Sequence, residues 1–261
     1  MRLFLLPKDY NKEDSVTLTG KDYNYVVNVL RLKENQKISG RDREGNIYSL
    51  KIENIGPKCC TLSCTPSEIL EETTDSLPEN RPEVPIILYQ CLPKGRKTDE
   101  IIKRATEIGV RRIVLVKSKN CISDFSGKED SKISRYDSII TEAVQQSGST
   151  VPTMVEGVID ISRVPEHFAS FCKEQNTEGI GLVLHQAKLR ENQNSLFKAL
   201  NGFKGAVGIV VGSEGGFTDV ECRALMDKGF KAVLLKTNIL RCETASIYAI
   251  SAAQTILEES C

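Results

Sequence analysis

The stretch from Gly212 to Phe217 is the first whose residue types suggest chemistry. Its three glycines tolerate positive φ and allow a ligand to approach the backbone closely. Thr218 and Glu221 form an S/T-x-x-E capping box, so a helix amino terminus with free N–H donors follows the glycines. The stretch is neither the G-x-G-x-x-G pattern nor the phosphate-loop pattern. A ligand cradle and a plain strand-to-helix turn therefore stand as alternatives.

A second stretch, residues 236–245, combines apolar and charged side chains in an expected loop. Ile239 and Leu240 are apolar but flanked by polar residues, and Arg241 and Glu243 stand where the last helix begins. Apolar loop residues beside an arginine suit a pocket wall with one anchoring charge. The alternative is a buried loop with a surface Arg–Glu pair that contributes little to stability.

The histidines and cysteines of the chain carry weaker signals. His185 follows Leu184 at an expected strand end, where it has either a structural role or a ligand contact, and His167 carries no signal. The nine cysteines include no C-x-x-C pair, and no histidine lies near the group at residues 59–64. Free thiols in a reducing compartment fit this pattern better than a metal site or disulfides, so we expect no metal.

The elements that must position these stretches alternate between strand and helix after residue 85. We expect Thr98 to cap the first helix, Gly109 to end it, and Gly148 to stop the second. This alternation predicts an α/β fold with a mainly parallel sheet, in which ligands bind beyond the carboxyl ends of the strands. Strands are expected at 86–92, 112–116, 180–184, 206–211 and 231–235, and helices at 98–109, 134–147, 218–229 and 244–258.

The amino-terminal part has a different pattern. Residues 1–68 are β-rich, with a hairpin expected over 36–52 and a short helix over 23–32. Residues 66–85 contain four prolines and six acidic residues against one arginine, so 69–84 is predicted to be a linker. Residues 85–261 then form the second domain.

Composition and charge argue against a membrane-spanning or secreted protein and leave a nucleic-acid-binding protein open. No apolar run approaches the roughly 20 residues that span a bilayer, and the initial apolar run is too short for a signal peptide. We therefore expect a cytoplasmic protein. The 261 residues have zero net charge, but residues 94–119 hold nine basic and three acidic side chains. That stretch is either a nucleic-acid footprint or a solvated helix face.

Together these motifs resemble one bacterial family. Gly212-Ser-Glu-Gly-Gly-Phe, followed after a helix and a strand by Ile239-Leu-Arg-Cys-Glu-Thr-Ala, resembles the paired signature of the ribosomal RNA small subunit methyltransferase E proteins. These belong to the SPOUT class of S-adenosylmethionine-dependent RNA methyltransferases. Three further stretches resemble the same family in the same order, so the likeness spans nearly the whole chain. They are residues 29–32, 94–110 and 142–152.

The resemblance implies a fold, a reaction and a set of binding residues. The fold is a PUA-like β-barrel that binds RNA, followed by a SPOUT domain with a trefoil knot, assembled as a homodimer. The reaction is methylation of N3 of a specific uridine in 16S rRNA, either free or in the small ribosomal subunit, with S-adenosylmethionine as cofactor. The cofactor residues would be Leu184, His185, Gly212, Glu214, Gly215, Gly216, Leu235, Ile239, Leu240, Arg241, Thr244 and Ala245.

Two residues are candidates for the chemistry. Arg241 would stabilise negative charge on a uracil carbonyl as N3 loses its proton, and Glu243 is a possible base or a helix-capping residue. The candidates for RNA phosphate contacts are Arg2, Arg31, Lys94, Arg96 and Arg104.

The sequence also departs from the family pattern. Ser213 replaces a proline, Lys236 a glycine that lies near the cofactor, Cys242 a threonine, and Ser149 an arginine, while Asn24-Tyr25 replaces a pair of histidines. A catalytically impaired RNA-binding relative and a methyltransferase with a different RNA target therefore stay open as alternatives.

Overall fold

The computed structural model describes residues 3–67, 84–122, 129–186 and 193–259. The chain divides into two compact units. The first unit comprises Met1–Arg81 with Val144–Pro152, and the second comprises Pro82–Ala143 with Thr153–Cys261. The inclusion of Val144–Pro152 in the first unit was not expected from the sequence. All but the last residue of the predicted linker, 69–84, lies outside the described residues.

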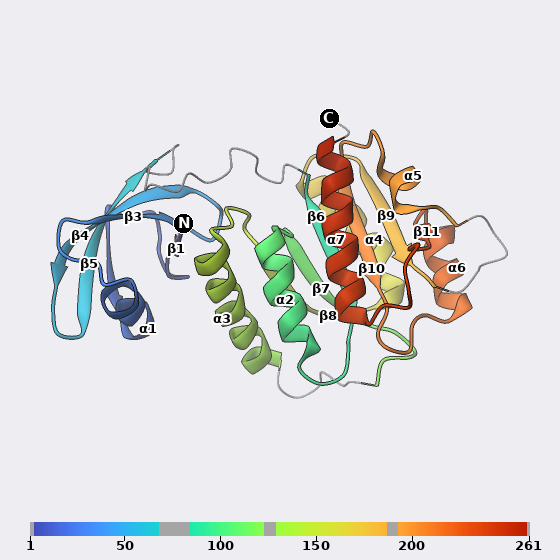
Figure 1. The fold of residues 1–261 in the computed structure, drawn as a ribbon, viewed down its shortest axis with the longest axis horizontal. Helices are drawn as coiled ribbons and strands as arrows, with labels where there is room; N and C mark the ends of the chain where they lie inside the picture. The colour runs from blue at the N-terminus through green and yellow to red at the C-terminus, as the bar shows by residue number, and fades with distance from the viewer. Residues whose placement is uncertain (1–2, 68–83, 123–128, 187–192, 260–261) are drawn as a thin grey trace. The chain divides into compact units, whose positions relative to one another are not determined.

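The first unit is built on a curled, five-stranded sheet (Figure 1). The sheet is antiparallel except where β1 pairs with β3, and β3 and β4 form the expected hairpin. The PUA-like β-barrel is thus present as a curled sheet whose edge strands, β1 and β2, have no pairing with each other in the described residues. In sheet order the strands are β1 (Phe4–Leu5), β3 (Lys37–Arg41), β4 (Ile47–Ile55), β5 (Cys59–Pro66) and β2 (Ser15–Thr19).

The core of this unit follows from alternation along its strands. Leu50 and Ile52 of β4 and Leu62 of β5 point to the same side and are completely buried. The short helix expected over 23–32 begins and ends about three residues earlier, as α1 (Gly20–Tyr23) followed by a π-helical segment (Asn24–Val29) that buries Val26.

A buried arginine ties Val144–Pro152 to this unit. Arg41 is 1% exposed, and its guanidinium donates to the carbonyl oxygens of Ser149 and Val151, each at 3.0 Å. Burial, followed by the charge of Arg43, lowers the pKa of Arg41 to about 10. The carbonyl partners are what make this burial tolerable, because a buried guanidinium without acceptors would be strongly destabilising.

The second unit is built on a six-stranded sheet in which every pair of neighbouring strands is parallel. The predicted α/β fold with a parallel sheet is confirmed. The strand order reverses at β6, since β7 and β8 lie on one side of it and β10, β9 and β11 lie on the other. In sheet order the strands are β11 (Lys231–Val233), β9 (Gly179–Leu184), β10 (Ala206–Val211), β6 (Ile86–Cys91), β7 (Arg112–Lys117) and β8 (Met154–Asp160).

Helices cover both faces of this sheet. Helices α2 and α7 pack side by side on one face (Figure 1). Consecutive residues of a strand point to opposite faces of the sheet. Gln90 of β6 bonds Ser246 of α7, and its neighbour Tyr89 bonds His167 of α4. Helix α4 therefore covers the face opposite α7. The helices are α2 (Lys97–Ile108), α3 (Glu129–Ser147), α4 (Val164–Glu174), α5 (Leu196–Leu200), α6 (Asp219–Asp227) and α7 (Cys242–Glu259), with a 3₁₀ turn at Ile161–Arg163.

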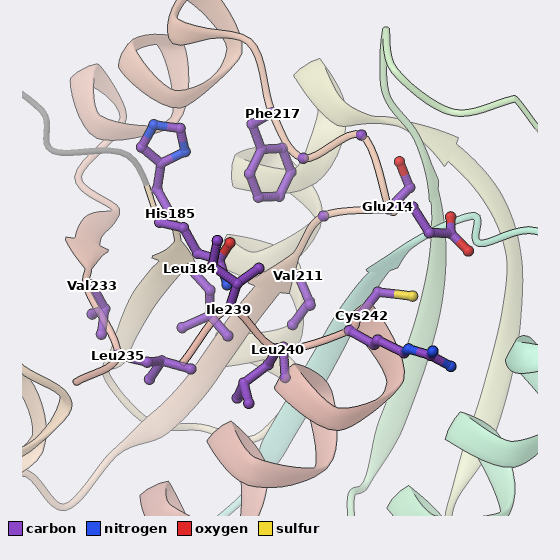
Figure 2. Close-up of a pocket in the computed structure, with 17 residues that line it drawn as sticks. Leu184, His185, Val211, Glu214, Phe217, Val233, Leu235, Ile239, Leu240 and Cys242 are labelled. Atoms are coloured by element: carbon purple, nitrogen blue, oxygen red, sulfur yellow. The ribbon is translucent and has the colours of Figure 1, made fainter. Parts of the chain in front are cut away.

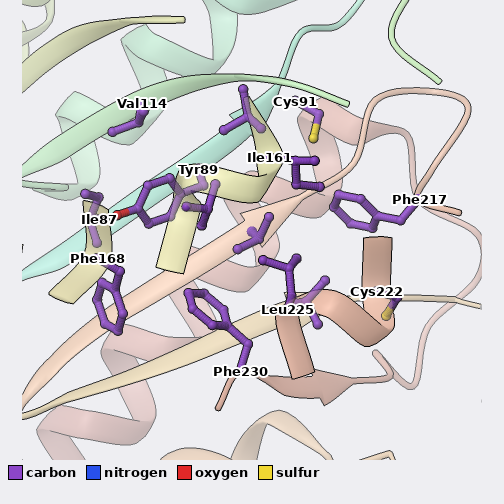
Figure 3. Packing of buried hydrophobic residues seen from close by; sticks show 14 of the residues in the cluster. Ile87, Tyr89, Cys91, Val114, Ile161, Phe168, Phe217, Cys222, Leu225 and Phe230 are labelled. Carbon is purple, nitrogen blue, oxygen red and sulfur yellow. The ribbon is translucent and has the colours of Figure 1, made fainter. Parts of the chain in front are cut away.

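Aromatic side chains fill the core beneath α4 and α6 (Figure 3). The Phe168 and Phe230 rings meet with their centroids 5.7 Å apart. Two strand glycines make room for them, since a Cβ at Gly181 would lie 2.5 Å from Phe230 and one at Gly208 would lie 2.9 Å from Phe168. Close ring-to-strand packing therefore explains both glycines.

Two differences from the sequence-based expectations concern local structure. Thr98 does not cap α2, because the helix begins at Lys97 and Arg96 occupies the N-cap without a side-chain hydrogen bond. Gly109 does end α2, with φ at 95°. Strand β8 and helix α4 were not anticipated. For β8 the apolar pattern in the sequence is weak, because none of its residues is fully buried.

Candidate functional site

A cavity of about 490 Å³ lies at the carboxyl ends of β9, β10 and β11, beside the point where the strand order reverses (Figure 2). This is where open parallel sheets bind ligands, and the volume suits a small organic molecule. Both stretches singled out in the sequence contribute to its wall. The lining residues are Leu184, His185, Gln186, Val211, Gly212, Ser213, Glu214, Gly215, Gly216, Phe217, Val233, Leu235, Ile239, Leu240, Arg241, Cys242 and Ala245.

The first turn of the site, Gly212–Phe217, leads directly into α6. Thr218 Oγ1 accepts from the Glu221 amide at 3.3 Å, and the Glu221 carboxylate accepts from the Thr218 amide at 2.9 Å, so the predicted capping box is confirmed. Gly216 has φ at 61°, and a Cβ on Gly212 would lie 3.1 Å from the Gly216 Cα. The tight path of this turn therefore depends on glycine at both positions.

Residues of a neighbouring loop hold this turn from outside. The Asn120 side chain donates to the carbonyl oxygens of Gly215 at 2.9 Å and Gly216 at 3.4 Å. The Lys119 amide donates to Glu221 at 2.7 Å. Sequence reasoning missed both residues, and the only signal for them was their place just after the strand that ends at Lys117.

The second turn of the site, residues 235–241, brings apolar side chains to the opposite wall. Leu235 and Leu240 are half-buried, whereas Ile239 is 87% exposed although it lines the cavity. Arg241 is exposed and also lines the cavity. Burial, followed by a hydrogen bond to Glu243, raises the pKa of the Cys242 thiol to about 12. This thiol is therefore protonated at neutral pH.

One cation lies between two carboxylates next to the site. Lys97 Nζ is 2.7 Å from Glu214 Oε1 and 3.5 Å from Glu243 Oε2. Burial opposes ionisation of both glutamates. For Glu214 the bonds from Lys97, from its own amide and from the Lys94 amide together outweigh burial. For Glu243 the bonds from its own amide, the Cys242 thiol and Lys97 together do so, leaving each pKa below its usual value. Sequence reasoning missed Lys97.

His185 is a buried polar residue of the cavity wall. It is 7% exposed, and its Nε2 has no hydrogen-bond partner in the part of the chain that the structure describes. Burial lowers its pKa, and the charge of Asp219 opposes this only partly, so the imidazole is neutral at pH 7. A ligand group in the cavity would give this nitrogen the partner it lacks.

The expected cofactor residues therefore come together. All of them except Thr244, which is exposed on α7, line the cavity. Residues of the wall that were not expected include Gln186, Val211 and Phe217. Lys236, which stands where the family has a glycine, is exposed and is not part of the wall.

The candidate catalytic and RNA-contacting residues are more scattered. Arg241 lines the cavity, but Glu243 does not. Lys94 and Arg96 are exposed just before α2, whereas Arg104 forms ion pairs with acidic residues of its own helix, each at 2.9 Å. Arg31 is exposed in the first unit with φ at 56°, and Arg2 lies outside the described residues.

The described residues contain neither a cluster of metal ligands nor a helix that could span a membrane. Within residues 3–67, 84–122, 129–186 and 193–259, no group of histidine, cysteine or acidic residues could hold a metal ion. In the same ranges, no helix has the length and apolar character needed to cross a bilayer.

Comparison with known proteins assigns a family to this arrangement. Residues 80–254, more than half of the chain, match the RNA methyltransferase domain, and residues 18–63 match the RNA methyltransferase PUA domain. The chain is 30% identical over 228 residues to the ribosomal RNA small subunit methyltransferase E of Aquifex aeolicus, covering 85% of this chain and 87% of that protein. It is 29% identical to ribosomal RNA small subunit methyltransferase E 2 of Borreliella burgdorferi, covering 92% and 90%.

A solved structure extends the comparison to the fold. The ribosomal RNA small subunit methyltransferase E of Neisseria gonorrhoeae, solved bound to S-adenosylmethionine, is 27% identical. It superposes with a TM-score of 0.78, over 98% of each chain. Fold and site thus define an RNA methyltransferase with a PUA domain. The chain belongs to the ribosomal RNA small subunit methyltransferase E family.

Proposed function

We propose that this protein is an S-adenosylmethionine-dependent methyltransferase that acts on N3 of a specific uridine in 16S rRNA. The observation that carries the proposal is that the two signature turns, Gly212–Phe217 and residues 235–241, line the same cavity. The family relatives support the substrate class by their names, and the Neisseria protein supports the cofactor, because it was solved with S-adenosylmethionine bound.

The residues around the cavity fit this cofactor. Leu184, Leu235 and Leu240 offer an apolar wall for an adenine ring, and the glycine turn brings backbone polar groups to the same space. His185 Nε2, which has no hydrogen-bond partner among the described residues, would meet a polar group of the cofactor. Glu214, held ionised beside Lys97, gives the rim a negative charge suited to a sulfonium.

The protein's contribution to the reaction is alignment and charge stabilisation. When bound, S-adenosylmethionine supplies a methyl group that is already activated as a sulfonium, so positioning accounts for much of the rate. The exposed Arg241 guanidinium at the cavity would stabilise the negative charge that develops on a uracil carbonyl as N3 loses its proton to solvent water. Glu243 lies 3.5 Å from Lys97 and outside the cavity wall, so we assign it to ion pairing rather than to proton abstraction.

Several parts of this proposal concern assembly and RNA binding. We infer a PUA-like RNA-binding domain over 1–68, a linker over 69–84, and a SPOUT methyltransferase domain over 85–261 that carries a trefoil knot. We also infer a cytoplasmic homodimer that binds 16S rRNA or the small ribosomal subunit. Exposed basic side chains at Arg31, Lys94 and Arg96 would contact phosphates, and Arg104 would have to leave its intrahelical ion pairs to do so.

Nucleoside mass spectrometry tests the reaction directly. Small ribosomal subunits and protein-free 16S rRNA, both from a strain lacking this modification, would be incubated with the protein and deuteromethyl-labelled S-adenosylmethionine. The proposal predicts one labelled 3-methyluridine per 16S molecule in at least one of the two substrates. Label in a different nucleoside would overturn the assignment to uridine N3. Cofactor binding without any label would contradict 16S rRNA as the substrate and favour another RNA target or a catalytically impaired relative.

A further inference from the structure

Lys97 joins elements that are far apart in the sequence but adjacent at the cavity. It is the first residue of α2, and its ammonium contacts Glu214 of the first turn and Glu243 at the start of α7. Glu243 lies two residues after the second turn, so one side chain contacts the first wall of the cavity directly and the segment that follows the second wall. No other ion pair in the described part of the chain links this wall to that segment.

The stability of α2 does not explain a lysine at this position. A cation in the first turn of a helix faces the positive end of the macrodipole, which is unfavourable. The Arg96 N-cap makes no side-chain hydrogen bond that would compensate. The Lys97 side chain is nevertheless only 30% exposed, so its stabilising partners are the two carboxylates outside the helix.

The two carboxylates depend on Lys97 in different degrees. Glu214 also accepts from the Lys94 amide, at 3.2 and 3.3 Å to its two oxygens. Glu243 accepts from the Cys242 thiol at 3.2 Å. Neither of these donors reaches the other carboxylate, so without Lys97 the two negative charges would repel each other across the rim of the cavity.

We propose that Lys97 is a positioning residue of the cofactor pocket, which holds the two turns at the separation that the cofactor needs. This inference rests on the proposed binding of S-adenosylmethionine. Lys97 does not line the cavity, so it acts on the cofactor through Glu214 and through the first turn of α7. Such a clamp lowers the cost of ordering both turns when ligand binds.

Hydrogen exchange of the ligand-free protein tests the clamp without any cofactor. Lys97→Met should speed amide exchange about tenfold in peptides covering 212–217 and in those covering 236–243. Lys97→Arg, which keeps the charge and two or more donors, should restore rates to within about twofold of wild type. Lys103→Met is the matched control, since Lys103 is 33% exposed on the same helix and pairs with Glu142, at 3.4 Å, away from both turns. Unchanged exchange in either turn of Lys97→Met would overturn the proposal.

Calorimetry with S-adenosylmethionine then tests the consequence for binding. Lys97→Met should bind about tenfold more weakly, and Lys97→Arg and Lys103→Met within about threefold of wild type. Adding Glu214→Gln to Lys97→Met should cost less than Glu214→Gln costs alone, because paired residues are not additive. Additive losses would overturn the clamp. A wild-type protein that binds no S-adenosylmethionine would overturn the proposed function instead, and the exchange measurement would still decide the role of Lys97.

Discussion

Ser246 of α7 donates a hydrogen bond to the side-chain oxygen of Gln90 on β6, and both residues are completely buried. The Gln90 amide nitrogen donates in turn to the carbonyl oxygen of Cys91 at 2.9 Å, and lies 3.4 Å from that of Gly212. A single buried amide therefore connects the last helix, the central strand and the start of the first turn. The cavity owes part of its shape to this connection.

Replacement of Gln90 by leucine should destabilise the protein. The substitution leaves the carbonyl oxygens of Cys91 and Gly212 without this donor, and unsatisfied buried groups cost about 1–3 kcal/mol each. Urea denaturation of Gln90→Leu should show a loss of that order. Gln254→Leu on α7, which removes one part-buried hydrogen bond to Ile108, should lose about 1 kcal/mol or less. Equal stability of Gln90→Leu and wild type would show that the connection has no structural weight.

Replacement of Gly212 by alanine should weaken cofactor binding through the shape of the first turn. The added Cβ would lie 3.1 Å from the Gly216 Cα, and backbone cannot yield as a flexible side chain can. We expect an affinity for S-adenosylmethionine lowered about tenfold or more, measured by calorimetry. Gly157→Ala is the matched control, because a Cβ there meets nothing within 4 Å. The turn would not be a cofactor cradle if both variants bound as wild type does.

Arg241→Ala should separate chemistry from binding. Its guanidinium is exposed at the cavity, and it has no ion pair in the described part of the chain. Turnover should fall about 10²–10³-fold, as for the loss of an oxyanion donor, while cofactor affinity stays within about threefold of wild type. Single-turnover methyl transfer and calorimetry measure the two quantities. Near-normal turnover would remove Arg241 from the reaction.

The cysteines beside the site should differ in reactivity at neutral pH. Hydrogen bonding from the Cys91 thiol, with further bonds from Ser118, lowers the pKa of Cys121 to about 5. Cys121 therefore forms thiolate more readily at pH 7 than Cys242, whose pKa is raised to about 12. Iodoacetamide at pH 7 should alkylate Cys121 well before Cys242, as followed by peptide mass spectrometry. Faster labelling of Cys242 would contradict these protonation states.

Local sequence patterns placed both turns at one edge of the sheet, because the carboxyl ends of parallel strands share an edge. The closeness of the turns after residues 211 and 233 depends on the pairing of β10 and of β11 with β9, which local patterns do not predict. The Thr218–Glu221 capping box is local and was readable from spacing alone. The cap expected at Thr98 was wrong because α2 begins at Lys97, which places Thr98 inside the first turn, and spacing does not fix the first residue of a helix.

The residues that sequence reasoning missed depend on strand order. Asn120 and Lys97 reach the first turn because β10 pairs with β6 and β6 with β7, which brings the loops after β6 and β7 alongside the loop after β10. Hydrophobic periodicity predicts that strands exist but not which strands are neighbours. The contacts of both residues with the first turn could therefore not be predicted from their positions in the chain.

The most direct test of the central claim is a titration of S-adenosylmethionine into the wild-type protein and a cavity-filling variant. Leu235 is half-buried in the cavity wall, so Leu235→Trp should occupy the space without disturbing the core. We expect wild type to bind one cofactor per chain, and Leu235→Trp to fold with a similar Tm but to show no measurable binding heat. Equal binding by both proteins, or no binding by either, would contradict the claim that the cavity between the two turns is the cofactor site.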